Sequence, residues 1–185
     1  RLLITNAREN PANGHYFELR HYYLSLSEDT VRESPVLMSC MSMLQSIRMN
    51  VEESERWYGE LEAYAANHTG SARKEAKSRL LYLDIGLPHR GTIQMVDILK
   101  HAYALIREHR VVLSEFSVTS NLPSQMNGGK DFCEWSRKDK ELAASIGKMV
   151  SLVLGNNGKG LVSLALAESF LEKGMDSYEV VSLAE

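Results

Sequence analysis

Two glycine-rich loops are the features that could most directly hold a phosphate. Residues 155–160 read GNNGKG, and Gly128, Gly129 and Lys130 form a second, shorter run. A phosphate-binding P-loop needs the pattern G-x-x-x-x-G-K-[ST] after a strand. In 155–160 the glycine spacing differs, Gly160 stands where serine or threonine is required, and a predicted helix precedes the loop. We therefore predict that residues 155–160 form a turn between helices and that Gly128, Gly129 and Lys130 form a turn before a short helix, with Lys130 kept as a candidate ligand-binding residue.

The histidines lack the spacing of a metal site. His15 and His21 are six residues apart, and His101 and His109 are eight apart. Neither pair has the i,i+4 spacing that places two ligands on one helix face, and no Cys/His cluster accompanies them. We predict no metal and no other cofactor.

Cys133 is the residue that could act as a nucleophile. A reactive thiolate needs a nearby histidine or a positive surrounding. The neighbouring charges balance, since Lys130, Arg137 and Lys138 are matched by Asp131, Glu134 and Asp139. We predict a half-buried structural cysteine, and we predict no catalytic residues in this chain.

Three other residues have both a structural and a ligand-binding interpretation. His89 and Arg90 follow a predicted helix end, where a cation interacts well with the helix dipole. Trp135 is favoured as a packing anchor, although aromatic side chains also stack on ligands in pockets. The candidate ligand-binding set is therefore Lys130, Trp135, His89 and Arg90.

Composition limits the classes of function. The chain has 185 residues and a formal net charge of −3, with ordinary globular contents of hydrophobic and charged residues. A nucleic-acid-binding domain usually carries a basic excess, so we expect no direct nucleic-acid contact. No apolar run approaches a membrane span, no signal peptide is evident, and two distant cysteines suit a reducing cytoplasm. Because the chain begins at Arg1 and stops at Glu185 inside a predicted helix, we expect an excised domain of a longer protein.

Apolar residues recur at helical spacing along most of the chain. Ser34 and Pro35 favour a helix start, and Leu37, Cys40 and Leu44 form a stripe on a helix that is apolar enough to be sandwiched between neighbours. Capping boxes are predicted at Asn50/Glu53, Ser136/Asp139 and Asp176/Glu179, and helix ends at Gly155 and Gly174. Residues 28–33 read as a polar linker, and 111–120 as a short helix.

Helix starts are predicted near residues 34, 50, 71, 92, 136, 157 and 176. Most steps give a two-helix unit of roughly 37 to 42 residues, the period of stacked helical hairpins. We predict an all-α fold, a right-handed α-solenoid of tetratricopeptide-like antiparallel hairpins. Residues 1–185 are expected to form a single domain, with an irregular seam near 108–136.

Residues 164–185 resemble a tetratricopeptide unit. Leu166, Ala167 and Phe170 match its first helix and Gly174 its turn, whereas Ser163 stands in place of the expected aromatic residue. Three phrases narrow the resemblance: RLLYLDIGLPHRG (79–91), FSVTSNLPSQMNGGKDFCEW (116–135) and GNNGKGLVSLALAESFLEKGMDSYEV (155–180). Together they resemble the central helical-repeat region of MalT-like bacterial transcription regulators of the LuxR class. The resemblance covers Tyr58 to the end of the chain.

This resemblance implies a non-catalytic sensor or scaffold arm between an ATPase and a helix-turn-helix domain that lie outside residues 1–185. Its expected partners are a small-molecule effector or regulatory protein, the other domains of the same chain, and further copies of itself; no membrane contact is expected. A stand-alone helical-repeat adaptor between proteins is the alternative. An enzyme is the weakest hypothesis, and it would require His89, Asp131 and Cys133 to converge.

Overall fold

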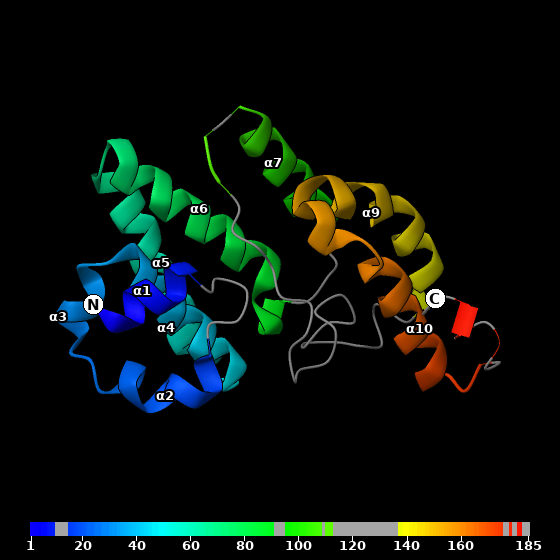
Figure 1. Cartoon of the computed structure of the whole chain (residues 1–185), viewed down its shortest axis with the longest axis horizontal. Coiled ribbons are helices and arrows are strands. Elements are labelled where there is room, and N and C mark those ends of the chain that lie inside the picture. Colours follow the sequence, from blue (N-terminus) through cyan, green and yellow to red (C-terminus); the bar gives the residue numbers. More distant parts are fainter. Residues whose placement is uncertain are drawn as a thin grey trace. The chain divides into compact units, whose positions relative to one another are not determined.

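The computed structural model describes residues 1–9, 15–90, 95–108, 110–112, 137–175, 178 and 181–182. In these residues all regular structure is helical and no strand occurs, which confirms the all-α prediction (Figure 1). Within the same ranges, no helix has both the length and the apolar character needed to cross a bilayer.

The contacts divide the described residues into two compact units. The first unit falls within Arg1–His89 and Leu105–Ser117, and the second unit falls within Arg90–Ala104 and Val118–Glu185. The helices up to η1 are α1 (Leu2–Glu9), α2 (Tyr16–Leu24), α3 (Glu28–Arg32), α4 (Pro35–Ile47), α5 (Val51–Asn67), α6 (Gly70–Gly86) and the 3-10 helix η1 (Pro88–Arg90). The remaining ones are α7 (Met95–Arg107), α9 (Asp139–Leu154), the 3-10 helix η2 (Gly155–Gly158) and α10 (Leu161–Glu172). The single domain predicted for 1–185 stays a prediction.

Helix α4 is the core of the first unit. Its residues from Pro35 to Ser46 are all buried, and it packs against α5 and α6 as well as α1, α2 and α3. Ser34 caps its start by accepting a hydrogen bond from Leu37 N–H at 3.4 Å, and Pro35 needs no donor there. Both the predicted helix start and the predicted sandwiching are confirmed.

Helices α5 and α6 follow α4 through short connections. Residues 48–50 join α4 to α5, residues 68–69 join α5 to α6, and both pairs are in contact (Figure 1). Short connections between packed helices make them antiparallel neighbours. The pairing of adjacent helices predicted from the sequence is therefore confirmed, whereas a right-handed solenoid stays a prediction.

The polar linker predicted for residues 28–33 is wrong, because α3 occupies them. Ser27 caps this helix by accepting from Thr30 N–H at 3.4 Å, and Arg32 bonds Glu28 one turn away at 2.7 Å. A cap and an i,i+4 ion pair thus stabilise a five-residue helix with four polar residues and a single buried apolar one, Val31.

The capping box predicted at Asn50 and Glu53 is also wrong. Asn50 N–H donates to Gln45 C=O at 2.9 Å and Met49 N–H to Ser46 C=O at 2.9 Å. These bonds close a Schellman motif at the end of α4, with Met49 left-handed at φ 60°. Asn50 therefore completes the preceding helix, and its side chain donates to Gln45 Oε1 rather than capping α5.

In the second unit, α9 packs against α10. Gly155 ends α9 with φ 58°, η2 follows, and Gly160 precedes α10 with φ 77°. The GNNGKG loop is thus an interhelical turn, as predicted. Gly174, at φ 66°, and Met175 close a second Schellman motif, which confirms the predicted end of α10.

Asp139 joins the beginning of α9 to the end of α10. Its carboxylate is buried and accepts from Ser169 Oγ and Lys173 Nζ, each at 2.6 Å, and from Lys140 N–H at 2.7 Å. Burial raises the pKa of Asp139, but these hydrogen bonds outweigh it and hold the pKa below the ordinary value. Ser136, the partner predicted for Asp139, lies outside the described residues.

Several further expectations also fall outside the described residues, including the start at Thr92, the box at Asp176 and Glu179, and nearly all of the seam near 108–136. Of the helix predicted for 111–120, Val111 and Val112 are described and are not helical. Val112 N–H instead donates to Ser78 Oγ on α6 at 3.0 Å.

Asp139→Asn should destabilise the α9–α10 unit by about 2 kcal/mol, because the amide replaces a charged acceptor of two side chains. Since the folded pKa of Asp139 is lowered, its contribution is complete above the unfolded value of 3.8 and is lost as the pH falls through the folded pKa. Urea unfolding of both proteins at pH 7 and at pH 3 measures this. An equal gap at the two pH values would contradict it.

Met49→Gly should stabilise the first unit by about 1 kcal/mol, because glycine adopts the left-handed conformation without a Cβ penalty. Gly174→Ala, at the same position of the other Schellman motif, should destabilise by a similar amount. No atom lies within 4 Å of a Cβ placed there, so the effect is conformational. Thermal unfolding of both variants provides the comparison, and a fall in Tm for Met49→Gly would refute it.

Candidate functional site

His89, one of the four predicted ligand-binding residues, is buried between α4 and α5. Only 6% of its surface is exposed. Its Nδ1 lies 2.7 Å from Ser46 Oγ, and its Nε2 lies 2.6 Å from Glu55 Oε1. Because a carboxylate only accepts, Nε2 carries the hydrogen and donates to Glu55. His89 N–H also reaches Ser46 Oγ, at 3.4 Å.

A serine, a histidine and a glutamate in series invite comparison with a hydrolase triad. In that triad the serine faces Nε2 of the histidine and the carboxylate faces Nδ1. Here the two partners are exchanged. Ser46 also has no exposed surface, so an external substrate cannot reach its Oγ. The arrangement is a polar cluster, buried at Ser46 and His89 and partly exposed at Glu55, that fixes η1 onto α4 and α5.

The sequence did not reveal the partners of His89. Ser46 lies 43 residues away along the chain and Glu55 lies 34 away. In the sequence, Ser46 is one polar residue within an apolar stretch, and Glu55 is one of several acidic residues that follow it. No local pattern in the sequence links positions so far apart. The ring of His89 contacts the side chains of Ser46 and Glu55 rather than the carbonyl groups at the end of a helix.

The other predicted site residues are less informative. Arg90 is half-buried and is not without an interaction partner. Lys130 and Trp135 lie outside the described residues, as do Asp131 and Cys133, so the convergence required for an enzyme is untested. The ligand-binding set stays a prediction. In the part of the chain that the structure describes, no cluster of three metal-ligating side chains occurs.

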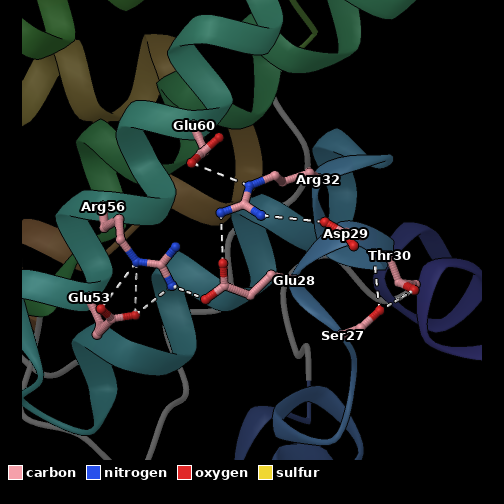
Figure 2. Close-up of polar contacts among 8 residues, drawn as sticks. All are labelled: Ser27, Glu28, Asp29, Thr30, Arg32, Glu53, Arg56 and Glu60. Atoms are coloured by element: carbon pink, nitrogen blue, oxygen red, sulfur yellow. Dashed lines mark hydrogen bonds and ion pairs between the residues drawn. The ribbon is translucent and has the colours of Figure 1, made fainter.

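Charged residues form a second cluster, where α3 meets α5 (Figure 2). Glu28 lies between Arg32, at 2.7 Å, and Arg56, at 3.1 Å, while Arg56 also contacts Glu53 at 2.8 Å. The guanidinium carbon of Arg56 lies 4.4 Å from the centre of the buried Trp57 ring. Hydrogen bonding to Glu53 raises the pKa of Arg56. Each of these charges meets an opposite charge within the cluster, so its role is to hold α3 on α5.

Described residues of the first unit line two cavities. One, of about 320 Å³, lies between α2 and α4 and is lined by Tyr16, Arg20, Leu24, Leu44, Ile47 and Arg48. The other, of about 540 Å³, is lined from α1 by Leu2, Leu3 and Ile4, and further by Arg1, Leu26, Thr30, Glu33, Ser34 and Leu37. Among the described lining residues, the second cavity has charges of both signs, in Arg1 and Glu33, whereas the first has two arginines.

Comparison with known proteins identifies no relative. No family model, no curated protein and no solved structure matches this chain. The resemblance to MalT-like regulators rests on the three sequence phrases alone.

His89→Ala should destabilise the first unit by about 2 to 3 kcal/mol, because it opens a cavity and removes the partner of the buried Ser46 hydroxyl. His21→Ala, at an exposed position of α2, is the control and should change stability by less than about 0.5 kcal/mol. Chemical denaturation measures both. An ester hydrolysis activity that disappears in a folded Ser46→Ala variant would contradict the structural role.

Proposed function

We propose that this chain is a non-catalytic sensor or scaffold arm of a MalT-like, LuxR-class bacterial transcription regulator. It binds an effector or a partner protein and relays that event to ATPase and DNA-binding domains outside residues 1–185. The observation that supports this most is the packing of consecutive helices in pairs, α4 with α5, α5 with α6, and α9 with α10. Paired helices of this kind are the units from which helical-repeat arms are built.

The surface of the α9–α10 pair supports an interaction role. Leu152 on α9 exposes 64% of its surface, and Leu164 and Leu171 on α10 expose 41% and 67%. Leu164 and Leu171 are seven residues apart, so they lie on the same face of α10. In a repeat array such a face is covered by the next unit or by a partner.

The relay requires a ligand that distinguishes two packing arrangements. A ligand shifts a conformational equilibrium only by the difference in its affinity for the two states. Connections as short as residues 48–50 and 68–69 couple each helix to its neighbour, so a ligand that moves one helix against α4 also moves the next. This gives the arm a means to transmit binding.

A stand-alone adaptor is the second candidate, and the exposed leucines of α9 and α10 favour it. The two functions differ in what the chain is attached to. An adaptor acts through its outer faces alone, whereas a sensor arm acts only when joined to an ATPase and a DNA-binding domain.

Deletion of residues 1–185 from the parent protein should abolish effector-dependent transcription while DNA binding by the helix-turn-helix domain persists. A reporter gene assay and a DNA mobility-shift assay measure the two properties. A deletion variant that still responds to the effector would contradict the sensor-arm proposal. A parent protein without ATPase and helix-turn-helix domains would favour the adaptor.

A further inference from the structure

We propose that the cavity lined by α1, α3 and the first turn of α4 binds a free hydrophobic α-amino acid such as leucine or phenylalanine. The inference rests on the proposed effector-binding function, and it gives that function a place and a ligand class. An α-amino acid carries an ammonium group, a carboxylate and, in these cases, an apolar side chain. The residues that line the cavity offer a matching group for each of the three.

The apolar part of the cavity comes from several elements. Leu2, Leu3 and Ile4 form the first turn of α1, Leu26 precedes α3, and Leu37 lies in α4. Leu37 is buried, whereas Leu2 exposes 87% of its surface and the other three are half-buried. A hydrocarbon side chain placed among them would remove apolar surface of both ligand and protein from water. The volume of about 540 Å³ lies within the range of small-molecule pockets.

Glu33 offers a partner for the ammonium group. It lines the cavity at the end of α3, and within the described residues its carboxylate takes part in no hydrogen bond or ion pair. The two acids of α3 differ in this respect, since Glu28 and Asp29 both pair with Arg32. A carboxylate only accepts hydrogen bonds, and a cationic donor forms the stronger ones. Glu33 therefore favours a ligand with a positive donor group.

Ser34, the next residue, offers a donor to the carboxylate. It lines the cavity although only 9% of its surface is exposed. Its Oγ accepts a hydrogen bond from Leu37 N–H at 3.4 Å, but the hydroxyl donates to no acceptor in the part of the chain that the structure describes. A buried donor without a partner is costly, so a ligand oxygen here would be stabilising. Ser34 is also the cap of α4, where the helix dipole favours an anion.

The adjacency of Glu33 and Ser34 matches the arrangement of charges in the ligand. The ammonium and carboxylate groups of an α-amino acid are attached to one carbon, so an acceptor and a donor on neighbouring residues suit both. Arg1 also lines the cavity, and its guanidinium forms no ion pair with any described residue, so it adds attraction for the carboxylate. Glu33 in turn disfavours a carboxylate that lacks the ammonium group. The site therefore selects the zwitterion over either singly charged analogue.

Isothermal titration and thermal unfolding of the whole chain with L-leucine and L-phenylalanine test the ligand class. Both amino acids should bind and raise Tm. Isocaproate is leucine without the ammonium group and isoamylamine is leucine without the carboxylate. Each should bind at least about tenfold more weakly than leucine, because it leaves one charged partner of the site unmatched. L-Alanine keeps both charges but has little apolar surface, and it should also bind more weakly.

Glu33→Gln should weaken leucine binding by about tenfold and leave isocaproate binding no weaker, because only leucine carries the ammonium group. Ser34→Asp keeps an acceptor that caps α4 but removes the donor and adds a negative charge, so leucine binding should fall by at least about tenfold. Ser34→Asn also caps the helix and its amide can donate, so this variant should retain most of the binding.

Glu52→Gln is the matched control, since Glu52 is exposed on α5 and does not line the cavity. This variant should bind leucine as the unmodified chain does. Circular dichroism and thermal unfolding of every variant verify that the helices are retained.

Equal affinity for leucine, isocaproate and isoamylamine would overturn the selection of a zwitterion. Absence of leucine and phenylalanine binding at millimolar concentration, or unchanged leucine binding by folded Glu33→Gln and Ser34→Asp variants, would overturn the assigned site. The proposed function fails separately. A parent protein that keeps effector-dependent transcription while neither amino acid binds would retain the sensor role and lose only this cavity. Leucine binding by a chain whose deletion leaves the effector response intact would retain the cavity and lose the sensor role.

Discussion

The complete burial of α4 is the constraint on which the first unit depends. A helix with buried residues all around needs neighbours on every side, and α1, α2, α3, α5 and α6 all contact it. Its sequence also carries serines, whose hydroxyls require partners once they are removed from water. Ser42 lies 3.3 Å from Ser54 Oγ, and Ser46 lies 2.7 Å from His89 Nδ1. These bonds set the positions of α5 and η1 relative to α4.

In the second unit, the buried polar group that needs partners is the carboxylate of Asp139. Asp139 is buried at the beginning of α9, where unpaired ionisation would be costly. Ser169 and Lys173 near the end of α10 supply the partners, each at 2.6 Å. In both units, then, apolar packing brings the helices together, and a few buried polar contacts determine how adjacent helices align.

The cavity between α2 and α4 reflects the side chains that α2 directs toward α4, which differ from the buried side chains of α5. Helix α2 places Arg20 and the exposed Leu24 toward α4, and long cationic side chains keep their head groups near water. The space between the helices is therefore left partly open.

The sequence by itself determined the helical class and those boundaries that depend on a few neighbouring residues. Ser34 and Pro35 begin α4, and Gly155 and Gly174 end α9 and α10, because caps and left-handed turns are made by local hydrogen bonds and backbone preferences. Local patterns also misled: the side chain of Asn50 bonds Gln45 of α4 instead of capping α5, and the residues predicted to form a polar linker form α3. Only the tertiary structure decided the pairing of His89 with Ser46 and Glu55 and of Asp139 with Lys173. These contacts join residues 30 or more positions apart, and their partners are chosen by how whole helices pack.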